Sequence, residues 1–343
     1  MNFKWRDLIS RLFIFTYAHL LLLASDNSLK ASSEEASDSD SESVVDISEE
    51  EEASDSICES LDSISKEEIE ELKNSIKSKI TAAGLDYVTY IKQFWVGLLE
   101  GDGTITVSSP GPKQVKVRFI ISIKNLRANV VMLLLIQEVI GGIVKIEHKA
   151  QYITWIAASK PLVKTLLEIL KEYPLLTTRK QCQLKFATKC IENGTRDFVV
   201  ENREFMYVDQ DKMLKYNDKN FVLPSYFPAW LSGFLEAEGC FRFCYDKRRA
   251  MQISTRFNIG QNFEHYIISA IRDYFGGTTI IQVIVSKKIF SEKRKLLGEV
   301  KHYYLEMGNK EVKNSIISHL DKYPLMGHKL VTYTRWYSHI KGK

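Results

Sequence analysis

Two acidic residues, Asp102 and Glu238, stand at the ends of two similar apolar segments in this chain of 343 residues. The first segment, Trp95 to Gly103, has the sequence WVGLLEGDG, and the second, Leu231 to Gly239, has the sequence LSGFLEAEG. If both segments are helices that lie together, their acids lie side by side near the carbonyl ends of the two helices. Such a pair of carboxylates is a site for hard divalent cations, so the repeat predicts a metal site with one ligand from each copy.

Small residues set four apart in each copy predict that the two helices pack on each other. They are Gly97 and Gly101 in the first copy and Gly233 and Ala237 in the second. One face of each helix then lacks side-chain bulk, so the two backbones can approach closely. The segments that follow both copies alternate as strands do, which makes two unrelated core helices a poor explanation of the repeat.

The two copies resemble the paired motifs of the single-chain LAGLIDADG homing endonucleases, and Tyr226 to Phe241 is similar to the second motif of intron-encoded members. The resemblance covers roughly residues 85 to 343. It implies a metal-dependent nuclease, a hydrolase that cuts the phosphodiester bonds of both DNA strands at a long asymmetric site and acts in intron mobility. It also implies a monomer with pseudo-two-fold symmetry that binds double-stranded DNA.

Hydrolysis of a phosphodiester needs a positioned water and stabilised charge on the attacking and leaving oxygens. Divalent ions that bridge an acid and the scissile phosphate supply both. We therefore expect Asp102 and Glu238 to be the metal ligands, one serving each strand, with Mg²⁺ as the ion. Glu100 and Glu236 lie two residues earlier and point about 200° away around a helix, so we expect them to be structural.

Members of the resembled family place a basic residue near each metal site, after a Tyr-Pro-Leu turn. Lys329 matches this position in the second half. In the first half Arg179 falls at the matching distance and Lys180 comes next, so both are candidates. An arginine there would act only electrostatically, because it does not lose its proton. Gln261 and Lys124, placed after the second strand of their respective halves, are candidates for contacts to water around the metal.

The fold class expected is α+β, with two pseudo-symmetric αββαββα halves that form a β-saddle around the two motif helices. Strands and helices are predicted in the first half at Thr104–Ser108, Gln114–Ile123, Asn125–Ile140, Gly142–Glu147, Gln151–Ala157, Lys160–Glu172 and Lys180–Ile191. The corresponding segments of the second half are Cys240–Tyr245, Ala250–Ile259, Glu264–Phe275, Thr278–Ser286, Val300–Glu306, Lys310–Asp321 and Lys329–His339.

Polar residues alternate with apolar residues on the predicted strands, as in any half-buried sheet, and several are of the types that bind base edges in the major groove. These candidates for DNA contact are Gln114, Lys116, Arg118, Arg242, Gln252, Ser254, Arg256 and Asn258. A basic loop adds candidates for phosphate contact at Lys287, Lys288, Lys293, Arg294 and Lys295.

The net charge of +4 hides an asymmetry, because the first 72 residues carry −14 and the remainder carries +18. A basic body favours a polyanionic partner. The predicted domains are an apolar N-terminal segment at 1–25, an acidic disordered tract at 26–75, a first half at 76–191, a linker at 192–225 and a second half at 226–343. A short charged helix is predicted at Lys66–Ile80, and another within the linker around Glu201–Leu214.

The apolar segment at 1–25 resembles a secretory signal, but a secreted DNA-cleaving enzyme makes little sense. Three interpretations stay open: an organellar targeting signal, translated exon sequence or a true membrane address, and the resemblance favours the first two. The resemblance favours an organelle, the mitochondrion over the chloroplast. The five cysteines show no metal-ligand spacing and are interpreted as free thiols. Two other functions stay open: an RNA maturase that helps its host intron splice, with or without cleavage, and a transcriptional regulator, which would have lost at least one acid.

Overall fold

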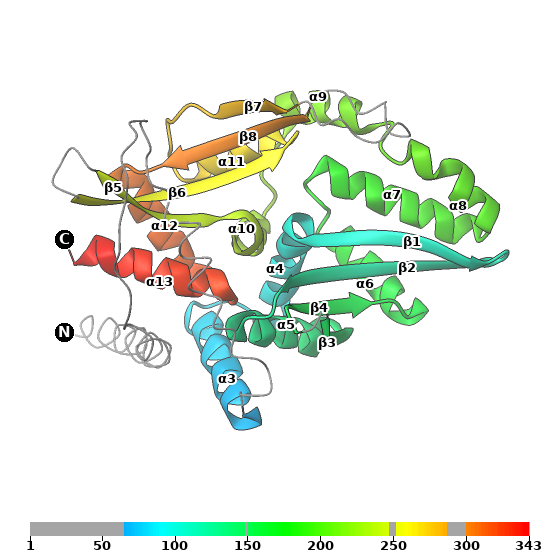
Figure 1. The fold of residues 1–343 in the computed structure, drawn as a ribbon, viewed down its shortest axis with the longest axis horizontal. Helices are drawn as coiled ribbons and strands as arrows, with labels where there is room; N and C mark the ends of the chain where they lie inside the picture. Colours follow the sequence, from blue (N-terminus) through cyan, green and yellow to red (C-terminus); the bar gives the residue numbers. More distant parts are fainter. Residues whose placement is uncertain (1–64, 148–149, 247–251, 287–299, 343) are drawn as a thin grey trace, which may run out of the picture.

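A computed structural model describes residues 65–147, 150–246, 252–286 and 300–342. The protein is α+β, and two four-stranded antiparallel sheets flank a central pair of helices, α4 and α10 (Figure 1). This arrangement confirms the predicted fold class. The predictions for residues 1–25, for the acidic tract up to residue 64 and for the basic loop at 287–295 lie outside the described residues. Within the described ranges, none of the helices is both long and apolar enough to span a bilayer.

The two halves repeat one order of elements. The first half contains α3 (Lys66–Ala82), α4 (Tyr87–Gly101), β1 (Gly103–Gly111), β2 (Gln114–Lys124), α5 (Arg127–Ile140), β3 (Ile143–Glu147), β4 (Tyr152–Ala157), α6 (Lys160–Glu172) and α7 (Thr178–Asn193). The second contains α10 (Phe227–Glu238), β5 (Cys240–Asp246), β6 (Gln252–Asn262), α11 (His265–Tyr274), β7 (Gln282–Ser286), β8 (Val300–Met307), α12 (Lys310–Lys322) and α13 (His328–Lys341). The sheets have matching strand orders, β1-β2-β4-β3 and β5-β6-β8-β7, so the predicted internal duplication is confirmed.

Local sequence signals explain where several helices begin. The Asp86 carboxylate accepts a hydrogen bond from the Thr89 amide at 2.8 Å and caps α4. The Asn309 side chain accepts one from the Val312 amide at 2.9 Å and caps α12. Prolines stand in the first turns of α6 and α10, where their missing N–H costs nothing. Helix α5 begins at Arg127, later than predicted, since Asn125 and Leu126 form the loop before it.

The linker between the halves contains two helices, α8 (Arg196–Asn202) and α9 (Gln210–Asn220), joined by a short 3₁₀ helix at Arg203–Phe205. The prediction of one helix around Glu201–Leu214 was therefore wrong. The Thr195 hydroxyl accepts a hydrogen bond from the Phe198 amide, which starts α8 earlier than expected. The turn that follows the 3₁₀ helix separates the two helices.

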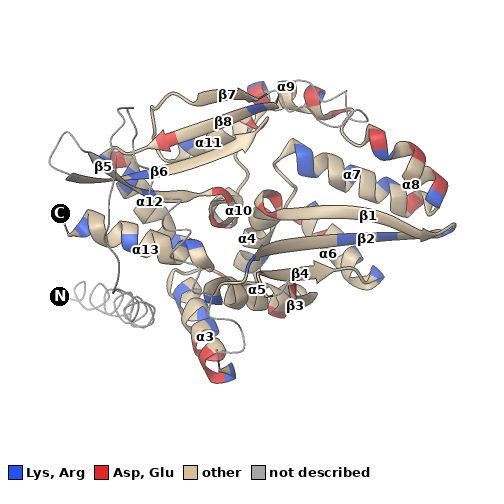
Figure 2. Ribbon diagram, in the orientation of Figure 1, with Lys and Arg blue, Asp and Glu red and all other residues tan. Residues whose placement is uncertain are grey.

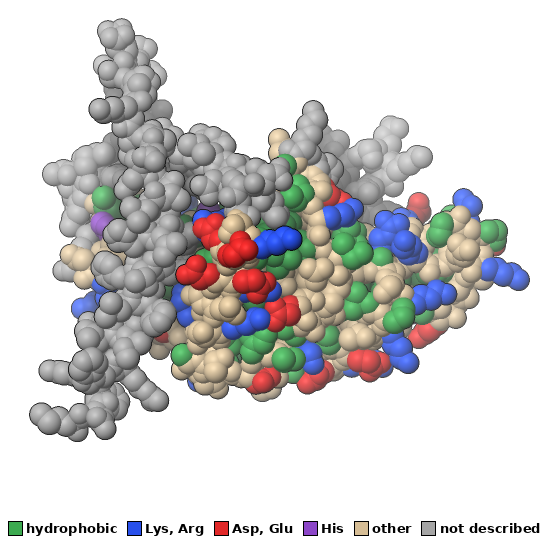
Figure 3. Space-filling model, turned by 90° about the horizontal axis from the view of Figure 1, so that it is seen from below, with side chains coloured by type: hydrophobic (Ala, Val, Ile, Leu, Met, Phe, Trp, Pro, Cys, Tyr) green, Lys and Arg blue, Asp and Glu red, His purple; other side chains and the backbone are tan. Residues whose placement is uncertain are grey.

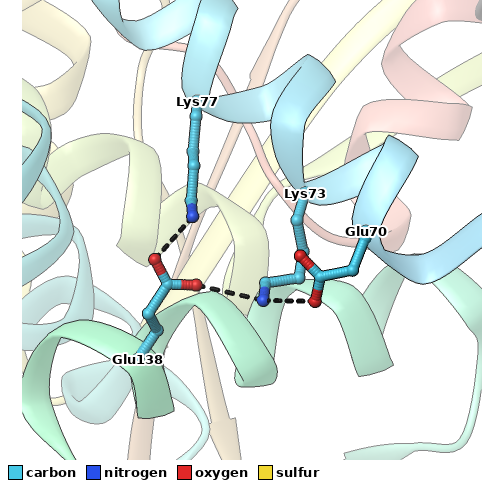
Figure 4. A network of polar contacts seen from close by, with 4 residues as sticks. All are labelled: Glu70, Lys73, Lys77 and Glu138. Atoms are coloured by element: carbon cyan, nitrogen blue, oxygen red, sulfur yellow. Dashed lines mark hydrogen bonds and ion pairs between the residues drawn. The ribbon is translucent and has the colours of Figure 1, made fainter. Parts of the chain in front are cut away.

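Helix α3 is part of the first half, because its apolar side chains Leu72, Ile76 and Ile80 are buried in the core. The predicted boundary at 75/76 falls inside this helix, so the folded part of the chain starts earlier than expected. Two ion pairs also join α3 to Glu138 on α5: Lys73 with Glu138 at 3.0 Å and Lys77 with Glu138 at 2.5 Å (Figure 4). Within α3, Lys73 also pairs with Glu70 at 2.8 Å. Seen from below, acidic and basic side chains lie intermixed on the surface (Figure 3).

Candidate active site

The two motif helices, α4 and α10, cross with their backbones in contact. A Cβ atom on Gly97 would lie 2.8 Å from the Phe234 amide nitrogen, and one on Gly233 would lie 2.8 Å from the Phe94 carbonyl carbon. Real Cβ atoms essentially never approach other atoms so closely. One turn later, Gly101 faces Ala237. The small residues of both motifs therefore meet each other, as their spacing predicted.

The glycines that end the two motifs, Gly103 and Gly239, stand where a larger residue would clash with the preceding helix turn. Gly239 has a φ of −71°, outside the left-handed region, and a Cβ atom there would lie 2.6 Å from the Leu235 carbonyl oxygen. A Cβ atom on Gly103 would likewise lie 2.6 Å from the Leu99 carbonyl oxygen. Each glycine thus lets the chain turn sharply from helix to strand directly after its acid.

Asp102 and Glu238 lie together at the meeting ends of α4 and α10, where Figure 2 shows acidic residues at the centre of the molecule. Burial raises the pKa of Glu238 to about 7, and the negative charge of Asp102 adds to this shift. Desolvation also raises the pKa of Asp102, against the opposing effect of the charges of Lys329 and Lys180. The electrostatic coupling of the two acids follows from the backbone contact of their helices.

The pair of acids fits a cation that also binds substrate. Among the described residues, no group of three or more His, Cys, Asp or Glu side chains could hold a metal ion. Two carboxylates alone suit a hard ion such as Mg²⁺, which commonly keeps waters and takes its other ligands from substrate phosphates. The donor set at Asp102 and Glu238 is therefore compatible with the expected metal, completed by DNA and water.

Glu100 and Glu236 point into the protein and bind the turns that precede α7 and α13. Glu100 accepts hydrogen bonds from the amides of Leu176 and Thr177 and from the indole of Trp230, the last at 2.8 Å. Burial raises the pKa of Glu100 to about 7, and these bonds oppose that shift.

Glu236 occupies the equivalent position in the second half. It accepts hydrogen bonds from the amides of Met326, Gly327 and Lys329 at 3.3, 3.1 and 2.8 Å. Both glutamates are 6% exposed or less. The prediction that these two acids are structural is confirmed.

The structure distinguishes between the two basic candidates of the first half. Lys180 is 6% exposed, and its amine donates a hydrogen bond to the carbonyl oxygen of Gly103, next to Asp102. Burial lowers the pKa of Lys180 to about 8. Arg179 lies on the exposed side of α7. Lys180 and Lys329 are thus the two cations whose charges act on both acids.

A family model described as LAGLIDADG endonuclease matches residues 95–190 and 231–340, and each match begins in one motif helix. The chain belongs to the LAGLIDADG endonuclease family. The two matches correspond to the two halves of the fold, so the resemblance drawn from the motifs is confirmed.

Similar proteins in this family are named as endonucleases. A probable intron-encoded endonuclease aI3 of Debaryomyces hansenii is 34% identical over 278 residues, which are 71% of this chain and 37% of that protein. A protein of the same name from Dictyostelium citrinum is 32% identical over 252 residues, which are 72% of this chain and 93% of that protein. The maturase alternative is not favoured by these relatives.

A solved structure of I-SmaMI, bound to an uncleaved DNA target in the presence of calcium ions, has the same fold. Its TM-score is 0.53 at 17% sequence identity, and the likeness covers 72% of this chain and 89% of that one.

Within the LAGLIDADG family, loss of a motif acid was the expected mark of a transcriptional regulator. Both Asp102 and Glu238 stand at the helix ends here.

The amide of Gln261 donates a hydrogen bond to the Glu238 carboxylate at 2.6 Å. Gln261 lies within β6 and Lys124 is the last residue of β2, so neither follows its strand as predicted. Gln261 pairs with Tyr303, whereas the equivalent pair in the first sheet is Ile123 with Ile153. Lys124 therefore is not the counterpart of Gln261, because the two residues stand on opposite faces of equivalent strands.

The candidate DNA-binding residues of the first half lie on the open face of β2. Lys116 and Arg118 stand opposite Ser108 and Thr106 of β1. The residues between and after them, Val117, Phe119 and Ile121, face the helices and are buried. Polar and apolar residues therefore alternate along β2 as predicted. Gln114, at the start of β2, is also exposed. Figure 2 shows basic residues along β2. The first LAGLIDADG half therefore presents a basic strand to solvent.

In the second half, Arg242 and Arg256 pair across β5 and β6, and Arg256 forms an ion pair with Glu306. Asn258 is only 3% exposed. When its side-chain amide is oriented with the oxygen toward Arg242 and Tyr304, it accepts hydrogen bonds from them at 3.0 and 2.7 Å. A direct base contact by Asn258 is thus disfavoured, since its polar atoms are already used within the sheet. Ser254 is partly buried, and the side chain of Gln252 and the loop with Lys287 lie outside the described residues.

Sequence reasoning missed the contacts that each half makes to the turn of the other. The Tyr90 hydroxyl donates to the carbonyl of Pro324 at 2.7 Å, and the Tyr226 hydroxyl donates to that of Pro174. Both tyrosines stand seven residues before the first glycine of their motifs, Gly97 and Gly233. That equal spacing, carried by the duplication, was the signal that could have identified them.

Proposed function

We propose that this LAGLIDADG protein is a site-specific endonuclease that cuts both strands of a long, asymmetric DNA site with Mg²⁺ or a similar divalent ion. The observation that carries the proposal is the position of Asp102 and Glu238, side by side at the ends of two helices in backbone contact. The intron-encoded relatives support a role in intron mobility. The resemblance of the motifs implies that this role belongs in an organelle, the mitochondrion rather than the chloroplast. Both halves come from one chain, so a monomer supplies both acids.

Asp102 and Glu238 would hold the divalent ions, each acid serving one of the two scissile phosphates. When bound, the metal polarises the phosphate and activates water for attack. The residues of the chain set the geometry: the Gln261 amide orients the Glu238 carboxylate, and the Gly101 backbone lies against its stem. Burial raises the pKa of Glu238 to about 7, so this carboxyl would need to lose its proton before it could hold a metal ion.

Lys180 and Lys329 supply positive charge beside the acids. The Lys180 amine donates a hydrogen bond to the carbonyl of Gly103, the residue directly after Asp102. In this position an amine stabilises charge on the phosphate or orients the attacking water. The lowered pKa of Lys180 also suits proton transfer near neutral pH.

The open faces of the two sheets bind DNA. Lys116 and Arg118 on the first sheet and Arg242 and Arg256 on the second are of the types that bind phosphates and guanine edges. Their side chains differ between the halves, so the target differs between its half-sites. Gln114 and Ser254 add to this surface in the proposal. The basic loop predicted to contact phosphates lies outside the described residues.

The proposal is tested by incubating the full-length chain with Mg²⁺ and DNA of the uninterrupted host allele, labelled on both strands. We expect the parent to cut both strands, and Asp102→Asn and Glu238→Gln each to leave mainly a nick. Glu168→Gln, an exposed acid on α6, is the matched control and should cut like the parent. A parent that binds this DNA but never cuts it, while promoting splicing of the intron RNA, would show that the protein is a maturase.

A further inference from the structure

The helices that carry Lys180 and Lys329 both begin without a cap of their own. Thr177 precedes α7 and makes no side-chain capping bond. Gly327 precedes α13 and has no side chain to offer. The first amides of a helix need acceptors from outside it, and a buried helix start cannot take them from water. Both starts are in the protein interior, with Thr178 fully buried and Gly327 buried.

The missing cap of α7 comes from the second half of the chain. Glu264, which precedes α11, is 2% exposed. Its carboxylate accepts hydrogen bonds from the Thr178 hydroxyl at 2.7 Å and from the Arg179 amide at 3.2 Å. A carboxylate at this end of a helix is also favoured by the helix dipole.

The start of α13 is capped from both halves: Glu236 of its own half accepts from the Lys329 amide at 2.8 Å, and the first half supplies the acceptor for the amide before it. The side-chain oxygen of Asn129, on α5, accepts a hydrogen bond from the His328 amide at 2.9 Å. Its side-chain nitrogen donates to the Lys124 carbonyl at 3.0 Å, which fixes the orientation of the amide. A Cβ atom on Gly327 would lie 2.6 Å from a Glu236 carboxylate oxygen and 2.9 Å from the same Asn129 oxygen, so the glycine makes room for both acceptors.

Tyrosines of the opposite half also hold the turns before these helices. The Tyr266 hydroxyl, on α11, donates to the Leu176 carbonyl at 2.6 Å, and Tyr226 donates to the Pro174 carbonyl. In the other direction, Tyr90 donates to the Pro324 carbonyl at 2.7 Å. Each turn is therefore held from two sides: by a glutamate of its own half and by polar groups of the other.

We propose that each half of the chain positions the active-site lysine of the other, with Glu264 setting Lys180 and Asn129 setting Lys329. This inference rests on the proposed nuclease function for the two lysines. Lys180 and Lys329 lie in the first turns of their helices, directly after the capped amides. A small displacement of a helix start moves the amine relative to the phosphate, and a misplacement of about 1 Å can cost about 100-fold in rate.

Strand-resolved cleavage under single-turnover conditions tests the inference. Lys180→Met and Lys329→Met first establish which strand each lysine serves. We expect Glu264→Ala to slow the strand that Lys180→Met slows by about tenfold or more, and to leave the other strand within about threefold. Asn129→Ala should slow mainly the strand that Lys329→Met slows. Glu264→Gln keeps an acceptor for Thr178 and should restore most of the rate.

Milder variants keep the test valid if Glu264→Ala does not fold. Tyr266→Phe removes only the hydroxyl that holds Leu176, and it should slow mainly the strand that Glu264→Ala slows. Tyr90→Phe should slow mainly the other strand. Equal slowing of both strands by folded variants, or an unchanged strand ratio, would overturn the inference.

A second measurement does not depend on cleavage. Labelling of lysine amines, followed by mass spectrometry, should proceed several-fold faster at Lys180 in Glu264→Ala than in the parent, with Lys329 unchanged. If the parent cuts neither strand but this labelling change occurs, the nuclease proposal fails and the cross-half positioning stands. Unchanged labelling of Lys180 in the folded variant would contradict the positioning itself.

Discussion

A Cβ atom on Gly97 would lie 2.9 Å from the carbonyl carbon of Trp230 and closer still to its oxygen. The same relationship holds in reverse between Gly233 and the Phe94 carbonyl. The two motif helices thus share a surface made of backbone on both sides. This contact brings the acids of the two halves together, and any added bulk must push them apart.

Replacing Gly97 with alanine should therefore destabilise the protein by about 3 kcal/mol, the upper end of the cost of overpacking a core. The measurement is urea unfolding followed by circular dichroism. Gly308→Ala is the matched control, because its Cβ would lie 3.6 Å from the nearest atom, an ordinary contact distance. If both alanine variants lose equal stability, the close helix contact is not the cause.

Lys180→Met should reduce the cleavage rate by about 100-fold while leaving DNA affinity nearly unchanged, since the amine acts beside the acids. Arg179→Met should leave the rate within about threefold of the parent, because this neighbouring side chain lies on the exposed surface. Single-turnover cleavage and a binding titration in Ca²⁺ separate the two effects. The reverse ranking would assign the role to Arg179.

Arg118→Ala should weaken DNA binding by about 1–3 kcal/mol and relax sequence preference at one position of the target, if the guanidinium binds a base edge. Binding is measured by fluorescence anisotropy at several salt concentrations, with single-base variants of the target. Lys164→Ala, on an exposed part of α6, provides the control. An equal loss in both variants would mean that only general positive charge matters.

The stability of the protein should fall with acid partly because of His319. This residue is 5% exposed, hydrogen-bonds Ser232 and Tyr274 at 3.1 Å each, and has its pKa lowered to about 3 by burial. The unfolded chain takes up a proton near pH 6.5, whereas the folded protein does not until near pH 3. The contribution to stability is therefore present above pH 6.5 and is lost as the pH falls, by about 2 kcal/mol between pH 7 and pH 5.

The measurement for His319 is the difference in urea stability between the parent and His319→Gln at pH 7 and at pH 5. A difference is needed because buried carboxyl groups with raised pKa values, such as Glu264, act in the opposite direction. We expect the variant to lose less stability than the parent over this interval. An unchanged pH dependence of stability in His319→Gln would contradict the prediction.

The duplicated motif allowed the fold to be predicted closely. The positions of Gly97 and Gly233 predicted which helix faces meet, and alternation along β2 predicted which side chains are exposed. Helical geometry correctly separated Asp102 from Glu100, because a spacing of two residues sends the two side chains in nearly opposite directions. These properties depend on local periodicity, which is present in the sequence.

Features that depend on tertiary packing and on strand register could not be predicted in the same way. Arg179 stands six residues after Tyr173, just as Lys329 stands six residues after Tyr323, and Lys180 follows it. Only the packed structure shows that Lys180 is the buried side chain. The pairing register decides that Ile123, and not Lys124, is equivalent to Gln261. Asn258 was predicted to face DNA, but its neighbours Arg242 and Tyr304 use its polar atoms within the sheet.

The sequence by itself determined the family, the two acids and the duplicated order of elements, because these follow from residue types at fixed local spacing. Tertiary structure alone decided which lysine approaches the acids and which groups cap its helix. Glu264 and Thr178 are separated by 86 positions, and Asn129 and His328 by 199. No local pattern relates such residues, so their contacts exist only once the two halves have packed on each other.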